Sequence, residues 1–247
     1  MPQSAPHPPA EAGPSLSPLS RGEGLLSVII PTLNAADTLK GLVEQLNAAA
    51  VVKEIVIADG GSSDETAAIA RKAGALVIAA PRGRGAQLAA GAEAATGDWL
   101  LFLHADCRLE AGCEPAVRAF LSTPEAGLHA GYFDFRLDDP APAARRVERF
   151  VDWRCRVLAL PYGDQGLLVA RRLYDLLGGF APLPLMEDVD FVRRLGRRRL
   201  ARIGCCCIAS PRRYRREGYW LRPMRNLFCL SLYFAGMAPH RIARFYG

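Results

Sequence analysis

Short apolar segments and helical segments alternate regularly along the first part of this chain. The apolar segments lie at residues 25–31, 54–59, 75–80 and 99–106, and the first three are rich in β-branched residues. The segments between them, at residues 35–49, 62–74 and 85–96, carry helical apolar spacing or helix start and stop signals. Such alternation is typical of parallel strands joined by crossover helices. The pattern predicts an α/β fold with a mostly parallel sheet flanked by helices.

The chain has 247 residues, which is long enough for one domain with a substantial core. Residues 1–24 are rich in proline, serine, glycine and alanine and lack the pattern of a secretory signal, so we expect a disordered tail there. The alternation becomes irregular after about residue 107, which divides the expected domain into residues 25–107 and a less regular half at residues 108–220. A short apolar stretch predicts a C-terminal helical segment at residues 221–247 that is too short to span a membrane.

Polar residues follow the predicted parallel strands at their carboxyl ends, where α/β proteins bind ligands. Asp59 ends the second strand and precedes two glycines, and the segment 99–106 ends with His104 and Asp106. Asp106 is a hard oxygen ligand suited to Mg²⁺ or Mn²⁺, and His104 lies on the same side of an extended chain. A tight turn at Asp59 and a helix cap at Asp106 are the structural alternatives.

Two further segments carry candidate ligand-binding groups. The loop at residues 81–87 offers exposed backbone amides beside Arg82 and Arg84, which suits phosphate. It lacks the third glycine of a dinucleotide fingerprint and follows the third strand, which argues against a Rossmann oxidoreductase. Glu187 and Asp188 begin a predicted helix, where a carboxylate can accept a proton from a hydroxyl, although acids are also common helix caps.

Positive charge is concentrated late in the chain, where residues 193–225 contain twelve arginines and one acid, Glu217. This asymmetry indicates either an anionic partner or a solvated basic face. Seven cysteines include three in a row at residues 205–207, and no CxxC pair suggests zinc. Because adjacent cysteines cannot easily bridge each other, we expect reduced thiols in a cytoplasmic protein.

The motifs, taken in order, resemble those of the family 2 glycosyltransferases. The series runs from PTLN after the first strand, through DGGSSDET, GRGAQ and the segment ATGDWLLFLHAD, to EDVDF some eighty residues later. The resemblance covers about residues 25–215 and implies the GT-A fold. The compact form also resembles a small soluble bacterial subgroup, of the kind associated with radical-SAM (selenodomain) or arsenosugar-biosynthesis genes.

The resemblance implies a nucleotide-sugar donor, with UDP-sugars favoured, and a divalent cation, Mn²⁺ or Mg²⁺. The cation would bind at Asp106, which matches the last aspartate of the family's DxD motif. His104 stands where the family usually has the first aspartate, and this departure leaves dependence on the cation open. The nucleotide would contact a set of residues spread over four strand ends and loops, namely Pro31, Thr32, Asn34, Asp59, Arg84, Gly85, Gln87 and His104.

The resemblance also assigns the catalytic base to the pair Glu187 and Asp188, with Asp188 as the first candidate. Asp188 would deprotonate an acceptor hydroxyl in an inverting single displacement. The acceptor would be a small molecule or a lipid. No QxxRW motif of the processive members is present, so we expect a single transfer rather than polymer synthesis.

Two other functions stay open at this stage. A nucleotidyltransferase has a similar sheet, but it usually carries a glycine-rich basic loop after the first strand, where this chain reads PTLNAADT. A non-enzymatic protein that binds membrane or nucleic acid through its arginines would leave the acids at the strand ends unexplained. We expect no nucleic-acid partner, whereas peripheral contact of the basic C-terminal segment with a membrane and packing of that segment on the domain both stay open.

Overall fold

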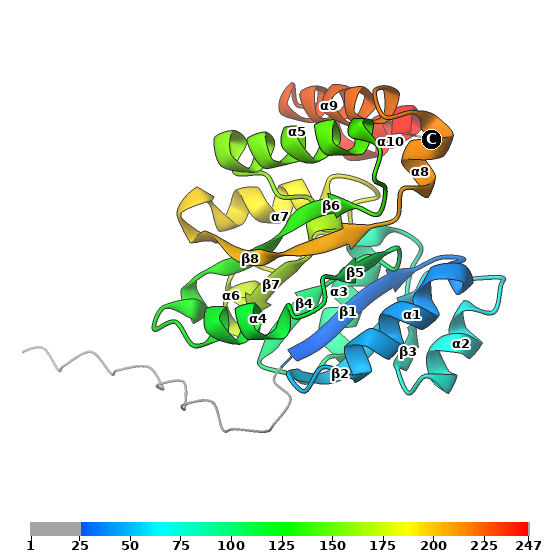
Figure 1. Cartoon of the computed structure of the whole chain (residues 1–247), viewed down its shortest axis with the longest axis vertical. Coiled ribbons are helices and arrows are strands. Elements are labelled where there is room, and N and C mark those ends of the chain that lie inside the picture. Colours follow the sequence, from blue (N-terminus) through cyan, green and yellow to red (C-terminus); the bar gives the residue numbers. More distant parts are fainter. Residues whose placement is uncertain (1–25, 247) are drawn as a thin grey trace, which may run out of the picture.

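The computed structural model describes residues 26–246 (Figure 1). The tail predicted at residues 1–24 lies outside the described residues. Within the described part, one sheet has the strand order β3-β2-β1-β4-β7-β6-β8-β5. Helices cover both faces of this sheet, as Figure 1 shows. The predicted α/β fold with a mostly parallel sheet is confirmed.

The first half of the sheet is wholly parallel. Its elements are β1 (Leu26–Thr32), α1 (Ala36–Asn47), β2 (Val52–Asp59), α2 (Thr66–Lys72), β3 (Leu76–Ala79), α3 (Arg84–Ala94) and β4 (Trp99–Phe102). β1 pairs in parallel with β2 and with β4, and β2 pairs in parallel with β3. All seven residues of β1 are buried, because helices cover this strand on both faces.

The second half mixes strand directions, which explains why the alternation fades along the sequence. Its elements are β5 (Cys107–Leu109), α4 (Glu114–Leu121), η1 (Ala126–Leu128), β6 (Ala130–Leu137), α5 (Pro142–Leu158), η2 (Gly163–Gln165), β7 (Leu167–Ala170), α6 (Arg171–Leu176), α7 (Glu187–Leu195), η3 (Arg197–Arg199), β8 (Leu200–Ala209) and α8 (Arg212–Glu217). β7 runs antiparallel to both β4 and β6, and β8 runs parallel to β6 but antiparallel to β5.

Two helices complete the chain and pack against α7. They are α9 (Leu221–Phe234) and α10 (Pro239–Tyr246), and Figure 1 shows α9 beside α5. A second apolar cluster joins Val189 and Val192 of α7 to Leu230 of α9 and Ile242 of α10. No helix between residues 26 and 246 combines the length and the apolar character needed to cross a membrane.

Two details of the sequence prediction are wrong. The segment 99–106 is not one strand, because β4 ends at Phe102 and Cys107 N–H then donates to the His104 carbonyl (3.1 Å), which closes a turn into β5. Asp106 therefore precedes a strand and caps no helix. The helix predicted at residues 62–74 also begins later than expected: α2 begins at Thr66, and Asp64 accepts the Thr66 N–H (3.0 Å).

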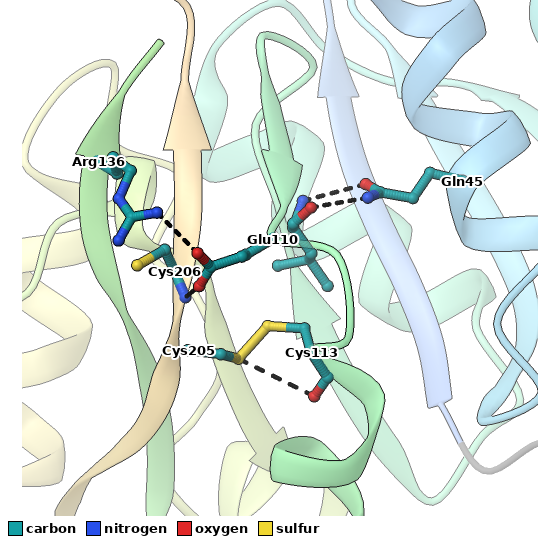
Figure 2. The surroundings of a disulfide bond; sticks show 7 residues. Gln45, Glu110, Cys113, Arg136, Cys205 and Cys206 are labelled. Atoms are coloured by element: carbon teal, nitrogen blue, oxygen red, sulfur yellow. Dashed lines mark hydrogen bonds and ion pairs between the residues drawn. A yellow bond between two sulfur atoms is a disulfide. The ribbon is translucent and has the colours of Figure 1, made fainter. Parts of the chain in front are cut away.

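The expectation of reduced thiols is wrong for one pair of cysteines. Cys113 and Cys205 form a disulfide with a Cα–Cα distance of 5.7 Å, although 92 residues separate them in sequence (Figure 2). The pairing of β5 with β8 brings the two together, since it places the segment before α4 against β8. Beside the disulfide, Glu110 accepts hydrogen bonds from Arg136 (2.7 Å) and from Cys206 N–H (3.3 Å). The other five cysteines are free and buried.

Candidate functional site

A pocket of about 750 Å³, measured with its open mouth, lies beyond the carboxyl end of β4. Its walls come from α3, the turn after β4, the loop around η2, the start of α7, and the three C-terminal helices. The charged and polar side chains that line it are Arg84, His104, Asp106, Tyr162, Asp164, Glu187, Asp188, Ser210, Arg213, Tyr214, Arg222, Asn226 and Tyr246. Five of the residues predicted from the sequence thus meet in one pocket: Arg84, His104, Asp106, Glu187 and Asp188.

The turn after β4 places His104 and Asp106 close together. Ligand atoms of His104, Asp106 and Cys107 lie within 4.8 Å of one another. Burial, with the nearby Arg84 guanidinium, lowers the pKa of His104 to about 4, so the imidazole is neutral at pH 7. A hydrogen bond with Cys207, together with burial, raises the pKa of the Cys107 thiol. A carboxylate and a neutral imidazole therefore face the pocket, and this donor set fits a divalent cation such as Mn²⁺.

Asp188 lies at the N-terminus of α7, where its charge complements the helix dipole. Its Oδ2 accepts the N–H of Gly163 (2.8 Å), and its Oδ1 accepts the N–H of Val189 (2.7 Å). Each carboxylate oxygen has a second lone pair. The backbone thus orients Asp188 at the pocket wall and leaves its carboxylate able to accept a proton.

Glu187 is 1 % exposed and lies next to Asp188 on α7. Burial raises its pKa to about 7, against the opposing charge of Arg84, whose Nε lies 3.3 Å from Glu187 Oε1. Its other oxygen, Oε2, has no hydrogen-bond partner among residues 26–246. Glu187 therefore holds Arg84 at the pocket and keeps one acceptor atom unsatisfied.

The loop between α5 and β7 contributes a residue that the sequence analysis missed. Burial raises the pKa of Asp164, and its Oδ1 has no partner within the described chain. Arg154 braces this loop by donating to the Leu160 carbonyl and to Gln165 Oε1, both at 2.9 Å. The motif YGDQG, which precedes a buried strand, could have indicated this residue, because an acid next to a glycine is unusual at the start of a core strand.

Part of the basic segment faces the pocket. Arg213 of α8 lies with its Nε 3.8 Å from Asp106 Oδ2, and Arg222 of α9 pairs with Glu217 at 3.0 Å. With Arg84, three guanidinium groups line the same cavity. Such a set favours an anionic ligand such as a diphosphate.

Four other predicted residues, Pro31, Thr32, Asn34 and Asp59, lie at or next to the ends of β1 and β2 and do not line this pocket. Burial acts to raise the pKa of Asp59, but hydrogen bonds from Ser62, Thr32 and Gly61 outweigh burial and lower this pKa. Asn34 adopts a left-handed φ of 52° and accepts the Ser63 N–H (2.9 Å). These contacts hold the two strand ends in one arrangement. Pro31, also predicted to contact nucleotide, lies within β1 beside them and is buried.

Gln87 and Gly85 have structural roles in this arrangement. The Gln87 amide is buried and donates to the carbonyls of Thr32 (2.7 Å) and Ala58 (2.8 Å). A Cβ at Gly85 would lie 2.2 Å from the Ala181 carbonyl oxygen, so only glycine lets α3 approach that loop. Their contact with nucleotide stays a prediction.

Comparison with known protein families identifies the domain. The model of "Glycosyl transferase family 2" matches residues 27–181, which is more than half of the chain. The chain belongs to this family. The family predicted from the motif order is therefore confirmed, and the match supplies Arg84, His104, Asp106 and Asp164 to the pocket.

Curated relatives of the family 2 domain come from mycobacteria. A PGL/p-HBAD biosynthesis glycosyltransferase of Mycobacterium bovis is 38 % identical over 110 residues, which are 41 % of this chain and 43 % of the relative. An uncharacterized glycosyltransferase of Mycobacterium tuberculosis is 31 % identical over 115 residues, 42 % of this chain and 51 % of the relative. The chain spans about half the length of the curated relatives it matches.

Solved structures confirm the GT-A fold of this family 2 protein. Glucosyl-3-phosphoglycerate synthase from Mycobacterium tuberculosis, in complex with Mn²⁺, UDP and phosphoglyceric acid, superposes with a TM-score of 0.58 and 21 % identity over 87 % of this chain and 79 % of that one. The same enzyme with Mn²⁺, UDP and glucosyl-3-phosphoglycerate superposes with a TM-score of 0.54 and 23 % identity, over 76 % of this chain and 70 % of that one. The family model ends before α7, so Glu187, Asp188 and the arginines of α8 and α9 lie beyond the matched region.

Proposed function

We propose that this protein is a glycosyltransferase that moves a sugar from a nucleotide-diphosphate sugar to an acceptor hydroxyl. The observation that carries the proposal is one pocket of a family 2 domain in which Asp106 and His104 face Asp188, with three arginines around them. UDP-sugars are the first candidates, because the structurally similar synthase was solved with UDP and Mn²⁺. The names of the curated relatives support the same reaction class.

The donor would lie across the carboxyl ends of β1, β2 and β4. Asp59, Thr32 and Asn34 are our candidates for contact with the nucleoside, since they cluster at the ends of β1 and β2. Arg84, Arg213 and Arg222 would hold the diphosphate. Asp106 and His104 would hold a divalent cation, which offsets the charge that develops on the leaving diphosphate.

Asp188 is our candidate for the catalytic base. Backbone N–H groups fix its carboxylate from two sides, so its position is set before substrate binds. It would take the proton of the acceptor hydroxyl as that oxygen attacks the anomeric carbon from the side opposite the diphosphate. A single displacement of this kind inverts the anomeric configuration. The narrower bacterial subgroup and the cytoplasmic location stay predictions.

Replacing Asp106 with asparagine should abolish cation-dependent nucleotide binding. The wild-type protein should gain about 2.7 kcal/mol of stability from UDP at a hundredfold its dissociation constant with Mn²⁺ present. We expect the variant to lose most of that gain, because an amide is a weaker cation ligand than a carboxylate. Thermal unfolding with UDP, with and without Mn²⁺, measures the difference.

Asp138→Asn is the matched control, since Asp138 is exposed, pairs with Arg108 and lies outside the pocket. Equal Mn²⁺-dependent shifts in the Asp106 variant and the control would place the cation elsewhere. A wild-type protein that unfolds cooperatively and responds to no nucleotide would remove the donor proposal. Release of pyrophosphate from a nucleoside triphosphate would instead indicate a nucleotidyltransferase.

A further inference from the structure

A second cavity lies beside the candidate active site, between α5 and α9. It measures about 420 Å³ including its open side. Side chains of Phe150, Trp153 and Leu158 from α5 face Leu227 and Leu230 from α9 across it. Most of its lining residues are apolar, and the polar ones include Arg154 and Asn226. It is an open groove rather than part of the packed core, since Trp153 is 49 % and Leu227 is 39 % exposed.

The groove and the candidate active site adjoin each other. Tyr162, Tyr214 and Asn226 line both cavities, so these three side chains form the junction between the polar pocket and the apolar groove. A ligand that extends through this junction would have a polar end near Asp188 and an apolar end along α5.

The polar end of the path carries buried oxygen atoms that lack a hydrogen-bond partner. Asp164 Oδ1, Glu187 Oε2 and Asn226 Oδ1 are buried and unpaired among the described residues, and all three residues line the pocket. The Asn226 oxygen is an acceptor, and the two carboxyl oxygens accept when ionised and donate when protonated. Leaving such a buried polar atom unsatisfied is costly. Hydroxyl groups of a ligand would satisfy them.

The surface around the groove fits an amphipathic ligand. Leu221, Met224 and Phe228 lie on one side of α9 and are 74 %, 56 % and 51 % exposed. Residues 221–247 contain four arginines and no acid. Arg222 and Arg225 pair with Glu217, whereas Arg241 and Arg244 of α10 are exposed, and their charge complements an anionic lipid surface. Exposed apolar side chains of this size beside arginines are typical of lipid contact.

We propose that the acceptor is a lipid: its hydroxyl-bearing head enters the pocket at Asp188, and its apolar chain lies in the groove between α5 and α9. This inference rests on the proposed function and names the substrate class of the same site. It also gives the C-terminal helices a role, because α9 forms one wall of the groove and supplies Asn226 to the junction.

Binding of alkyl glucosides tests the proposal, with methyl, butyl, hexyl and octyl glucoside as probes below their micellar concentrations. The head is constant, so any change in affinity along the series reports burial of the chain. Affinity measured by calorimetry should rise by up to about fourfold for each methylene that the groove covers. Leu227→Glu should flatten this dependence, because a carboxylate in the groove disfavours an alkyl chain.

Leu176→Glu is the matched control, since Leu176 is an exposed leucine on α6, away from both cavities. Its chain-length dependence should equal that of the wild type. An affinity independent of chain length in the wild type, or the same dependence in Leu227→Glu, would overturn the proposal. A dimer that covers α9 would give the first of these outcomes and would also double the mass in light scattering.

A second measurement, fluorescence quenching, leaves every residue of the groove unchanged, so it does not depend on whether a groove variant folds. In a Trp220→Phe background, a bromine-labelled octyl glucoside should quench the fluorescence of Trp153, because a heavy atom quenches only at contact, while Trp99 is buried in the core. Absence of quenching at saturating probe would contradict the groove assignment. UDP binding with Mn²⁺ is measured separately, so a protein that binds UDP but shows no chain dependence refutes only the lipid acceptor.

Discussion

Replacement of Asp188 by asparagine should lower the rate of sugar transfer by about 10²–10⁴-fold, the usual contribution of a general base. Asparagine has nearly the same shape, and its single amide oxygen can still accept one of the two N–H groups that Asp188 binds, from Gly163 or from Val189. Thermal unfolding of the variant checks that the loss of the other hydrogen bond leaves the protein folded. What asparagine cannot do is take the proton of the acceptor hydroxyl. UDP released from UDP-glucose, with octyl glucoside as the acceptor, measures the rate.

Asp190→Asn is the control for this prediction. Asp190 lies on the same helix turn, but its carboxylate pairs with Arg194 at 2.7 Å and does not line the pocket. Its variant should transfer sugar at nearly the wild-type rate. If the Asp188 variant keeps more than about a tenth of the wild-type rate at saturating substrate, the base is a different group. Glu187→Gln would then be the next variant, since Glu187 is the neighbouring buried acid.

The parallel half of the fold could be predicted from the sequence because its signals are local. Each strand there is a short apolar segment, each crossover helix has its own spacing, and parallel pairing follows from the alternation. Parallel strands have their carboxyl ends at one edge of the sheet, and there the Thr32 hydroxyl donates a hydrogen bond to Asp59 Oδ1 (3.0 Å). The prediction that His104 and Asp106 face a common ligand also assumed an extended chain, whereas a turn after β4 is what places the two residues close together.

The rest of the pocket could not be predicted because it depends on contacts between distant segments. Asp164 lies just before β7, which runs antiparallel to β4 and therefore begins at the carboxyl end of β4. Asn226 and Tyr246 come from the last two helices, which reach the pocket from far along the chain. The sequence neighbourhoods of these three residues resemble an ordinary loop or an amphipathic helix. Gln87 shows the converse limit, because its place in a motif suggested ligand contact while both of its observed donor bonds go to backbone carbonyls.

The cysteines show how a local reading can fail. Three adjacent cysteines cannot easily bridge one another, yet Cys205 pairs with Cys113, which the antiparallel pairing of β5 with β8 brings close. A sequence separation of 92 residues gives no hint of that proximity. The same separation makes the bond important for stability, because a cross-link over a long loop restricts the unfolded chain more than one over a short loop.

Loss of this disulfide should therefore lower the free energy of unfolding by about 2–5 kcal/mol. Urea unfolding of Cys113→Ala should show this decrease. Cys206→Ala is the control, because Cys206 is a free buried cysteine next to Cys205, and its free energy of unfolding should decrease less. A reducing agent should destabilise the wild type and leave Cys113→Ala unchanged, since only the wild type has the bond to lose.

Thiol titration of the denatured wild type decides whether the bond forms. The chain has seven cysteines, and five of them are free in the structure, so five reactive thiols are expected before reduction and seven after it. Seven thiols before reduction, with no effect of the reducing agent on unfolding, would show that the protein folds with reduced cysteines. In that case Cys113 and Cys205 would contribute only their packing between α4 and β8. Cys113→Ala and Cys206→Ala should then lower the free energy of unfolding by similar amounts.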